Sequence, residues 1–420
     1  MSVDSTLWPT HTSVKSEVAR STIIGSYGMN GLRRLLSLAR PAIPMTRRIL
    51  PPTIGTLGVY IFMQGDSSFN FVNQIRQYTT DITNINLLSS VMTAKAEAKY
   101  KCQDMVIEQD KAHELFLIIH LDSGASPKEC LKALQNIKGH VDRISPLDIR
   151  DEDNEVIFAI AFGPEFLDKV YPNAKKNGVE PFEFKERRGK NSTMPSTGGD
   201  ILVHATCGEK GKLFELAQAV LADMPESAIK KVEEEYGFVY RNGRDLSGFI
   251  DGTENPADED ERIEVAQSKV TGGSYVLTQK WQHDLKKIRN ETRKVMESKI
   301  GRTEEDSIEI KPIAPTSHVG RMTHGLSDEE SENMRIVRHS LPYGIASGQC
   351  GLFFIAYSKT PKTLDWMLDR MAGLMGDRIE DGLFHFTTAT TGTYFYSPSK
   401  LELEKIFKEG CTTAKKFSPF

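Results

Sequence analysis

The sequence predicts an α+β fold made of two similar halves that follow an N-terminal extension. Between residues 99 and 240, short apolar runs typical of buried strands alternate with segments of helical apolar spacing. A comparable order of elements recurs in residues 241–420, although the halves share no sequence repeat. Residues 1–98 lack this regular alternation, so we expect an extension there that is helical in its later part. The 420 residues suffice for two or three domains of ordinary size.

The first half is predicted to run in the order β-α-β-α-β-α-β. Its first strand is the apolar run 114–121, and Ser126 followed by Pro127 is typical of a helix start. The other expected elements are strands at 156–162, 201–205 and 231–240 and helices at 164–171 and 212–224. This order is compatible with an α+β sandwich of the ferredoxin-like kind.

The second half is predicted to repeat this theme around a long polar connection. The connection spans residues 301–332, and connections of such length in compact domains are often functional. The expected elements are strands at 274–281, 334–339, 352–357 and 392–396 and helical segments at 282–299 and 360–375.

The composition is that of an ordinary folded protein and excludes several classes. Lys plus Arg number 53 and Asp plus Glu number 57, so the charge balance does not call for nucleic acid or an anionic membrane as a partner. Five cysteines without any CxxC pair argue against a disulfide framework or a zinc knuckle and favour a reducing compartment. An apolar stretch of about 18 residues, which a membrane helix needs, is absent, so we expect no integral membrane segment.

The N-terminal extension contains a segment with an unusual charge pattern. Residues 18–65 carry six arginines but no Asp, Glu or Lys, and they are rich in Ser and Thr. This composition is typical of an organelle transit peptide, and a poorly ordered extension is the equally weighted alternative. Because a secretory signal is missing, the sequence predicts a cytoplasmic or mitochondrial protein that is not secreted.

Two polar loops contain candidate functional residues. The Gly-rich loop 245–256 can present Asp251 to a cleft, because Gly248 and Gly252 permit close backbone approach. The simpler alternative is a turn in which Asp251 caps its own backbone. His318, within the long polar connection, is a candidate metal or haem ligand, although a lone histidine is more often a surface or capping residue.

A strand near the end of the long connection supplies a third candidate. If residues 334–339 form a strand, Arg338 shares a face with Ile336, so the guanidinium either reaches an edge or is buried for a purpose. Residues 351–357 are apolar on both faces, which suits the wall of a large apolar cavity.

Taken together, these segments resemble the dye-decolorizing peroxidases. The motifs that carry the resemblance are, in order, Gly248-Phe-Ile-Asp-Gly-Thr-Glu-Asn-Pro256, Gly272-Gly-Ser-Tyr275, Gly301-Arg-Thr303, His318, Ile336-Val-Arg338, Leu341-Pro-Tyr-Gly344 and Thr391-Gly392. The form Asp-Gly-Thr-Glu-Asn-Pro and the run Arg-His-Ser-Leu-Pro-Tyr-Gly are most similar to the bacterial B-type branch. The resemblance runs from about residue 110 to 400 and leaves out the first hundred residues.

The resemblance implies two ferredoxin-like domains of the dimeric α/β barrel-like superfamily, with one haem b per chain in the C-terminal domain. It implies that His318 is the axial ligand of the haem iron and that Asp251 and Arg338 lie on the distal side of the haem. Ser340 stands where some B-type members carry Asn. Asp381 is our candidate for the acidic group that orients His318, and a solvated acidic loop is the equally weighted alternative.

The implied function is a haem peroxidase that uses hydrogen peroxide to oxidise a small organic donor. A haem- or porphyrin-handling protein with weak peroxidase activity is one alternative, and a haem-free interaction module is another. Because relatives form dimers and larger assemblies, we expect a homo-oligomer. Four aromatic residues are candidate electron relays, although packing in the core is the commoner role for such residues: Trp281, Trp366, Tyr343 and Tyr357.

Overall fold

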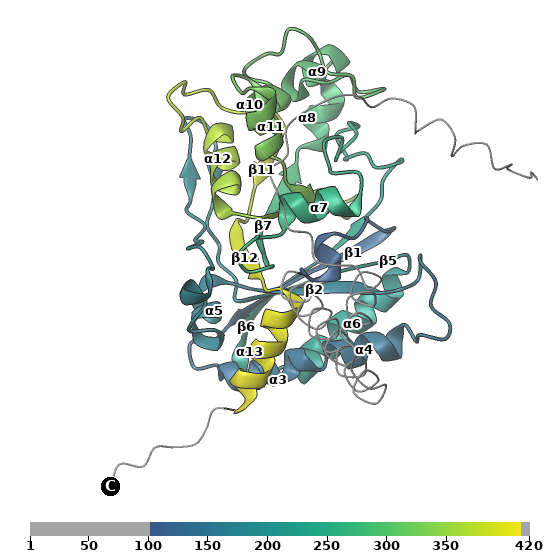
Figure 1. The fold of residues 1–420 in the computed structure, drawn as a ribbon. Helices are drawn as coiled ribbons and strands as arrows, with labels where there is room; N and C mark the ends of the chain where they lie inside the picture. The colour runs from purple at the N-terminus through teal and green to yellow at the C-terminus, as the bar shows by residue number, and fades with distance from the viewer. Residues whose placement is uncertain (1–100, 413–420) are drawn as a thin grey trace, which may run out of the picture. The chain divides into compact units, whose positions relative to one another are not determined.

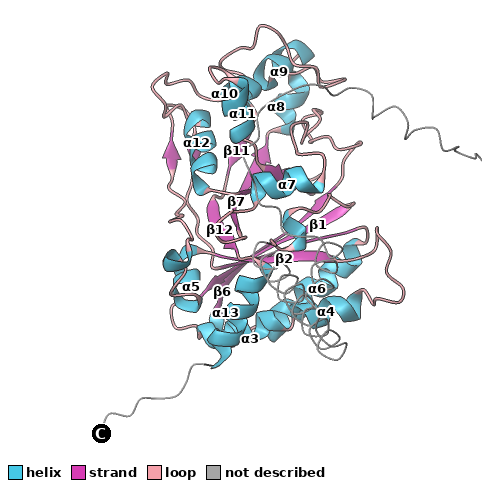
Figure 2. Cartoon of the chain, viewed as in Figure 1, coloured by secondary structure: helices cyan, strands magenta, loops and turns pink. Residues whose placement is uncertain are grey.

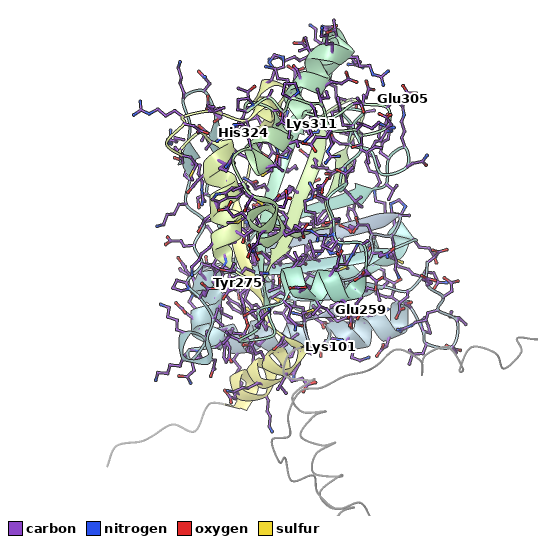
Figure 3. All side chains as sticks on the ribbon, turned by 45° about the horizontal axis from the view of Figure 1, so that its top comes forward. Lys101, Glu259, Tyr275, Glu305, Lys311 and His324 are labelled. Atoms are coloured by element: carbon purple, nitrogen blue, oxygen red, sulfur yellow. The ribbon has the colours of Figure 1, made fainter. Side chains whose placement is uncertain are left out.

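The computed structural model describes residues 101–412, with side chains to residue 410 (Figures 1–3). All of these residues belong to one of the two units into which the chain divides. The predicted extension, including the Arg-rich segment 18–65, lies outside the described residues. In the part of the chain that the structure describes, no helix is both long and apolar enough to cross a membrane.

One continuous ten-stranded sheet carries both halves of the described chain. Its main path runs β6-β1-β5-β2-β12-β7-β10-β8, with β11 paired to β7 and β9 paired to β10. All of these pairings are antiparallel. The strands are β1 (His113–Leu121), β2 (Ile157–Phe162), β5 (Ile201–Cys207), β6 (Ile229–Phe238), β7 (Ser274–His283), β8 (Val337–Arg338), β9 (Leu341–Gly344), β10 (Cys350–Ser358), β11 (Thr387–Ala389) and β12 (Thr393–Ser397).

The strand order confirms the predicted ferredoxin-like architecture. Counted along the first half, β6-β1-β5-β2 is the order 4-1-3-2, and β12-β7-β10-β8 repeats that order in the second half. The two halves join where Tyr396 of β12 pairs with Phe162 of β2. A small separate sheet pairs β3 (Arg187–Arg188) with β4 (Thr193–Met194) inside the loop between β2 and β5.

Helices and short 3-10 turns cover the sheet. In the view of Figure 1, helices α3, α4, α6 and α13 lie together below the strands of the first half. The helices are α3 (Pro127–Gln135), α4 (Ile137–Ile144), α5 (Pro164–Val170), α6 (Lys210–Asp223), α7 (Glu259–Ala266), α8 (Leu285–Asn290), α9 (Arg293–Ile300), α10 (His318–Thr323), α11 (Asp328–Asn333), α12 (Pro361–Met371) and α13 (Lys400–Thr412). The 3-10 turns are η1 (Asp104–Val106), η2 (Lys175–Asn177), η3 (Glu226–Ala228) and η4 (Gly382–His385).

Apolar side chains on the two faces of the sheet form two cores. Along β1, Leu115 and Leu117 point into the larger core, while Phe116 and Ile118 point into the smaller one. The smaller core also receives Val106 of η1 and apolar residues of α7. Because both faces are buried, β1 has the continuous apolar sequence from which the strand was predicted.

The structure differs from the sequence prediction mainly in the second half. Residues 282–299 contain the end of β7 and two separate helices, α8 and α9, instead of one helical segment. The polar connection 301–332 contains α10 and most of α11. The expected strand 334–339 is reduced to two residues, and α7 and α13 were not anticipated. Capping explains α9, because Thr292 Oγ1 accepts the Val295 N–H at its start (3.3 Å).

Candidate active site

The first part of the candidate site is a histidine–aspartate pair. His318 opens α10 directly after Ser317, whose hydroxyl accepts the Gly320 N–H at 3.1 Å and so caps the helix. His318 Nδ1 lies 2.7 Å from Asp381 Oδ2. The Asp381 carboxylate is fully buried, whereas the His318 side chain keeps 28% of its exposure. The structure therefore places Asp381 in contact with His318 and not in a solvated loop.

Backbone contacts fix the positions of His318 and Asp381 relative to each other. Asp381 Oδ1 accepts the Leu383 N–H at 2.8 Å and starts η4, and the Gly382 N–H donates to Thr316 O at 2.8 Å. Gly301, which ends α9 at φ +98°, comes so close to α10 that a Cβ there would lie 2.8 Å from Ser317 Oγ. The histidine is thus fixed by the helix start behind it and by the carboxylate beside it.

The pair also decides which nitrogen of His318 is free to bind a ligand. An ionised carboxylate only accepts hydrogen bonds, so Asp381 holds the hydrogen of the neutral ring on Nδ1. Nε2 then carries the lone pair, which is the arrangement of a metal-binding imidazole.

The second part of the site joins the Gly-rich loop to strand β8. Arg338 Nη1 donates to Asp251 Oδ1 at 3.1 Å, and both side chains are about one-fifth to one-quarter exposed. Asp251 Oδ1 also accepts the Gly252 N–H at 2.8 Å. Asp251 therefore bonds the N–H of the next residue, which is not the side-chain turn considered as the alternative, and forms an ion pair with Arg338 at the same time.

Asn255 fixes the position of Arg338. Its Oδ1 accepts the Arg338 N–H at 2.8 Å, and its Nδ2 donates to Arg338 O at 2.7 Å. The side-chain amide thus satisfies both main-chain groups of Arg338, as a neighbouring strand would. This bond ties the end of the loop that carries Asp251 to the strand that carries Arg338.

A buried acid holds the beginning of the same loop. Asp245 accepts from His283 Nε2 at 2.9 and 3.0 Å and from the Ser247 N–H at 2.9 Å, while its own N–H donates to Phe249 O. Burial alone would raise the pKa of Asp245, but His283 and the hydrogen bonds from Ser247 outweigh it and lower the pKa. The sequence analysis assigned no role to Asp245 or His283, which lie 38 residues apart along the chain.

Replacing Asp245 by Asn should loosen this loop and lower the free energy of unfolding by about 1–3 kcal/mol at pH 7. Because the pKa of Asp245 is lowered in the fold, its stabilisation is present above the unfolded pKa of about 4 and is lost as the pH falls further. Urea unfolding of both proteins between pH 3 and 7 measures the difference. A difference absent at pH 7, or equal to that of the exposed control Asp260→Asn, would contradict this role.

Comparisons with known proteins place this geometry in a family. The sequence matches the family models described as Dyp-type peroxidase, N-terminal, over residues 103–239 and Dyp-type peroxidase, C-terminal, over residues 242–402. The chain belongs to the Dyp-type peroxidases. Both halves of the sheet lie within the matched residues, as do all four candidate site residues.

Characterised members of this family are similar over most of the described chain. The dye-decolorizing peroxidase of Mycolicibacterium paratuberculosis is 32% identical, over 68% of this chain and 80% of that protein. The dye-decolorizing protein from V. cholerae is 32% identical, with a TM-score of 0.63 over 72% of this chain and 99% of that chain. A variant of DypB from Rhodococcus jostii RHA1, solved in complex with haem, is 29% identical, with a TM-score of 0.64 over 72% and 97%.

Ser340, two residues after Arg338, bonds the backbone of the sheet in this Dyp-type peroxidase. The Ser340 hydroxyl donates to Ile355 O at 3.4 Å and accepts the Ile355 N–H at 3.2 Å. It thereby extends the pairing between β8 and β10. Of the candidate relay residues, Trp281, Tyr343 and Tyr357 are buried, and Trp366 is half-buried beneath the Arg370 guanidinium.

A second polar cluster of this Dyp-type peroxidase lies inside the smaller core and was not foreseen. Glu114, His204 and Tyr357 are fully buried, and His204 bridges the other two with Nε2 at 3.1 Å and Nδ1 at 2.8 Å. Within the protein alone, burial raises the pKa of Glu114 and lowers that of His204. Three strands, β1, β5 and β10, contribute to the cluster, so no local sequence pattern could have revealed it.

Proposed function

We propose that His318, Asp381, Asp251 and Arg338 form the haem site of this enzyme. As a Dyp-type peroxidase, the chain is a haem-dependent peroxidase that acts on hydrogen peroxide and oxidises organic donors. The observation that carries the residue assignment is the contact of 2.7 Å between His318 and the buried Asp381. It fixes the His318 ring so that, in the neutral form that ligates a metal, Nε2 is the free nitrogen.

On the proximal side, His318 Nε2 would bind the iron of one haem b per chain. The donor chemistry fits, since a neutral histidine with a carboxylate on its other nitrogen is a strong axial ligand. The bound haem supplies the redox chemistry that accepts oxidising equivalents from peroxide and passes them to the donor. Asp381 acts through His318 by fixing the orientation of the ring and increasing its basicity.

On the distal side, Asp251 and Arg338 would handle the proton and the charge of peroxide cleavage. The two hydrogen bonds that Asp251 accepts within the described residues both reach Oδ1, which leaves Oδ2 to take a proton from hydrogen peroxide and return it to the leaving oxygen. The Arg338 guanidinium, held by Asn255 and Asp251, would stabilise negative charge that develops on the departing oxygen. This distal pair favours a peroxidase over a haem-handling protein, which would need only His318.

The Asp381→Asn variant tests the proximal assignment because it keeps the shape of the side chain and removes its charge. We expect haem affinity to fall by roughly 10- to 100-fold and the midpoint potential of the iron to rise, since the ligand becomes a weaker donor. Haem titration and spectroelectrochemistry measure the two quantities. Asp328→Asn, at the exposed start of α11, is the control. Unchanged affinity and potential in Asp381→Asn would refute the assignment.

We also propose the domain division, the cellular location and the oligomeric state of the chain. The division into domains at residues 99–240 and 241–420 is supported by the repeated strand order. The four described cysteines are buried free thiols, which supports a cytoplasmic or mitochondrial location. Imaging of the full chain would separate the two locations.

Self-association into a homo-oligomer, which light scattering measures, is proposed from the family resemblance. The structure of a Mycobacterium smegmatis relative is described as an encapsulated DyP-type peroxidase.

A further inference from the structure

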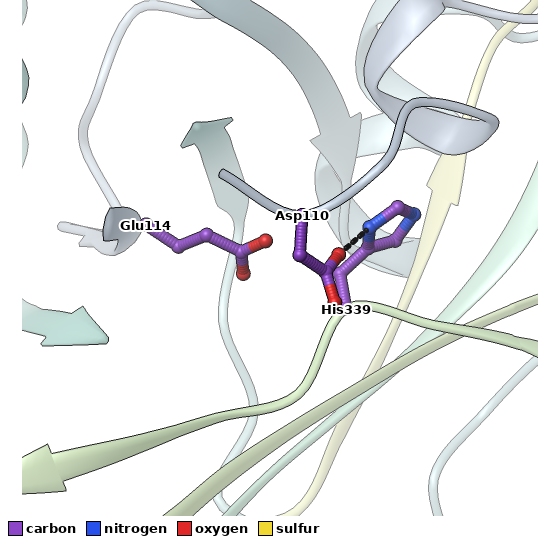
Figure 4. A group of neighbouring side chains, drawn as sticks. All are labelled: Asp110, Glu114 and His339. Atoms are coloured by element: carbon purple, nitrogen blue, oxygen red, sulfur yellow. Dashed lines mark hydrogen bonds and ion pairs between the residues drawn. The ribbon is translucent and has the colours of Figure 1, made fainter. Parts of the chain in front are cut away.

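We propose that Asp110, Glu114 and His339 bind a divalent first-row transition-metal ion at a site separate from the haem site. Potential ligand atoms of these residues lie within 4.8 Å of one another, and no other such group occurs among the residues that the structure describes. Figure 4 shows the Asp110 carboxylate between the Glu114 carboxylate and the His339 ring. His339 follows Arg338 in the chain, but it contacts the buried aromatic residues of the smaller core.

The hydrogen bonds of His339 leave a lone pair directed at Asp110. His339 Nε2 lies 3.3 Å from Val106 O, and because a carbonyl oxygen can only accept, Nε2 carries the hydrogen. In the neutral ring, Nδ1 then has a lone pair, and this nitrogen lies 2.6 Å from Asp110 Oδ1. Two acceptors so close require a proton or a metal ion at that place. A histidine whose second nitrogen donates to a backbone carbonyl is the usual form of a metal ligand.

Glu114 supplies the second, independent observation. It is fully buried, no donor in the described structure bonds its Oε1, and burial together with the nearby Asp110 carboxylate raises the pKa of Glu114. Its Oε2 lies 3.1 Å from His204 Nε2. When the Tyr357 hydroxyl donates to His204 Nδ1 at 2.8 Å, His204 Nε2–H donates to Glu114. Leaving a buried carboxylate oxygen unpaired costs about 1–3 kcal/mol or more, and a cation bound to Oε1 would remove that cost.

Asp110 completes the site and gives an ion access from solvent. Its side chain is 31% exposed, whereas that of His339 is fully buried. The segment before Asp110 is held in place by the buried Arg262, which donates to the carbonyl oxygens of Ile107 and Glu108. Ligands about 2.0–2.2 Å from one ion lie roughly 3.0–4.4 Å apart. The contact of 2.6 Å between Asp110 and His339 must therefore lengthen when an ion binds, and Asp110 is the partly exposed residue of the pair.

The donor set determines the class of ion. One imidazole and two carboxylates suit Mn²⁺, Fe²⁺ or Zn²⁺, while Mg²⁺ and Ca²⁺ prefer oxygen ligands alone. Two carboxylates also neutralise a divalent charge in a largely buried place. The His204 ring, itself bonded to Tyr357, would then orient the Glu114 carboxylate as a metal ligand, as outer hydrogen-bond partners do at metal sites.

Metal binding to the full-length, haem-loaded protein tests this proposal. After dialysis against a chelator, Zn²⁺ is titrated by calorimetry and Mn²⁺ by loss of its free electron paramagnetic resonance signal. We expect one ion per wild-type chain that binds at least tenfold more weakly in Glu114→Gln and in Asp110→Asn. We also expect Zn²⁺ to raise the Tm of the wild type but not that of Glu114→Gln or Asp110→Asn.

Two further variants keep the test decisive. Asp110→Asn changes a partly exposed side chain, so it should fold even if the buried Glu114→Gln does not. His140→Asn removes a histidine that pairs with Asp223 at 2.8 Å without a second carboxylate, and this control should bind the ion as the wild type does. No bound ion in the wild type, or equal binding by wild type and Asp110→Asn, would overturn the proposal.

Discussion

Replacing Arg338 by alanine should lower kcat/KM for hydrogen peroxide by roughly 10²–10³-fold, the effect of removing one fixed donor from a developing anion. Haem loading should stay close to that of the wild type, because the proximal His318 and Asp381 are untouched. The loss should appear mainly in the reaction with peroxide and little in the affinity for the organic donor. Stopped-flow rates at several peroxide concentrations measure it.

The control for this prediction is another arginine of the same segment. Arg335 forms ion pairs with Glu261 and Glu332 at 3.3 and 2.9 Å, three residues before Arg338. Arg335→Ala therefore removes the same charge from the same chain segment without touching Asp251. Arg338→Lys keeps the charge and loses the planar donor geometry, so its rate should lie between those of the wild type and Arg338→Ala. If Arg338→Ala and Arg335→Ala react equally fast with peroxide, Arg338 has no distal role.

Replacing His318 by alanine should have the second large effect, the loss of tight haem binding and with it of peroxidase activity. The side chain is the proposed iron ligand, and no other residue is offered for that position. Added imidazole should restore part of the haem affinity, because a small free ligand can occupy the space that the ring leaves.

His324 gives a matched control for this variant. It follows the last residue of α10 and is exposed, so His324→Ala removes an imidazole from the same neighbourhood without touching Asp381. Haem affinity and turnover of His324→Ala should equal those of the wild type. Equal loss in both variants would point to damage to α10 instead of loss of a ligand.

Local patterns in the sequence were sufficient to predict most of the first half. The strand β1 and the helix start at Ser126 follow from an apolar run and a capping residue, and both are confirmed. The expected strand at 334–339 was too long, because only Val337 and Arg338 of this segment pair with β10. The family and its ferredoxin-like halves were identified from motifs, and the comparisons and the strand order confirm both.

The contacts of the candidate site were harder to predict than its residues. The motifs singled out His318, Asp251 and Arg338, but the sequence left Asp381 equally open to a solvated role, since 63 residues separate it from His318. The anchoring of the loop by Asp245 and His283 depends on a pairing across 38 residues. Such pairings arise from the tertiary fold, and no local spacing encodes them.

The most direct test of the central claim is the visible absorption spectrum of the haem-loaded wild type and of His318→Ala, before and after one equivalent of hydrogen peroxide. We predict a Soret band in the wild type that shifts on addition of peroxide, and a lost or much weaker band in the variant. A wild-type Soret band that does not respond to peroxide would contradict the peroxidase account. An unchanged spectrum and peroxide response in His318→Ala would contradict the assignment of His318 as the iron ligand.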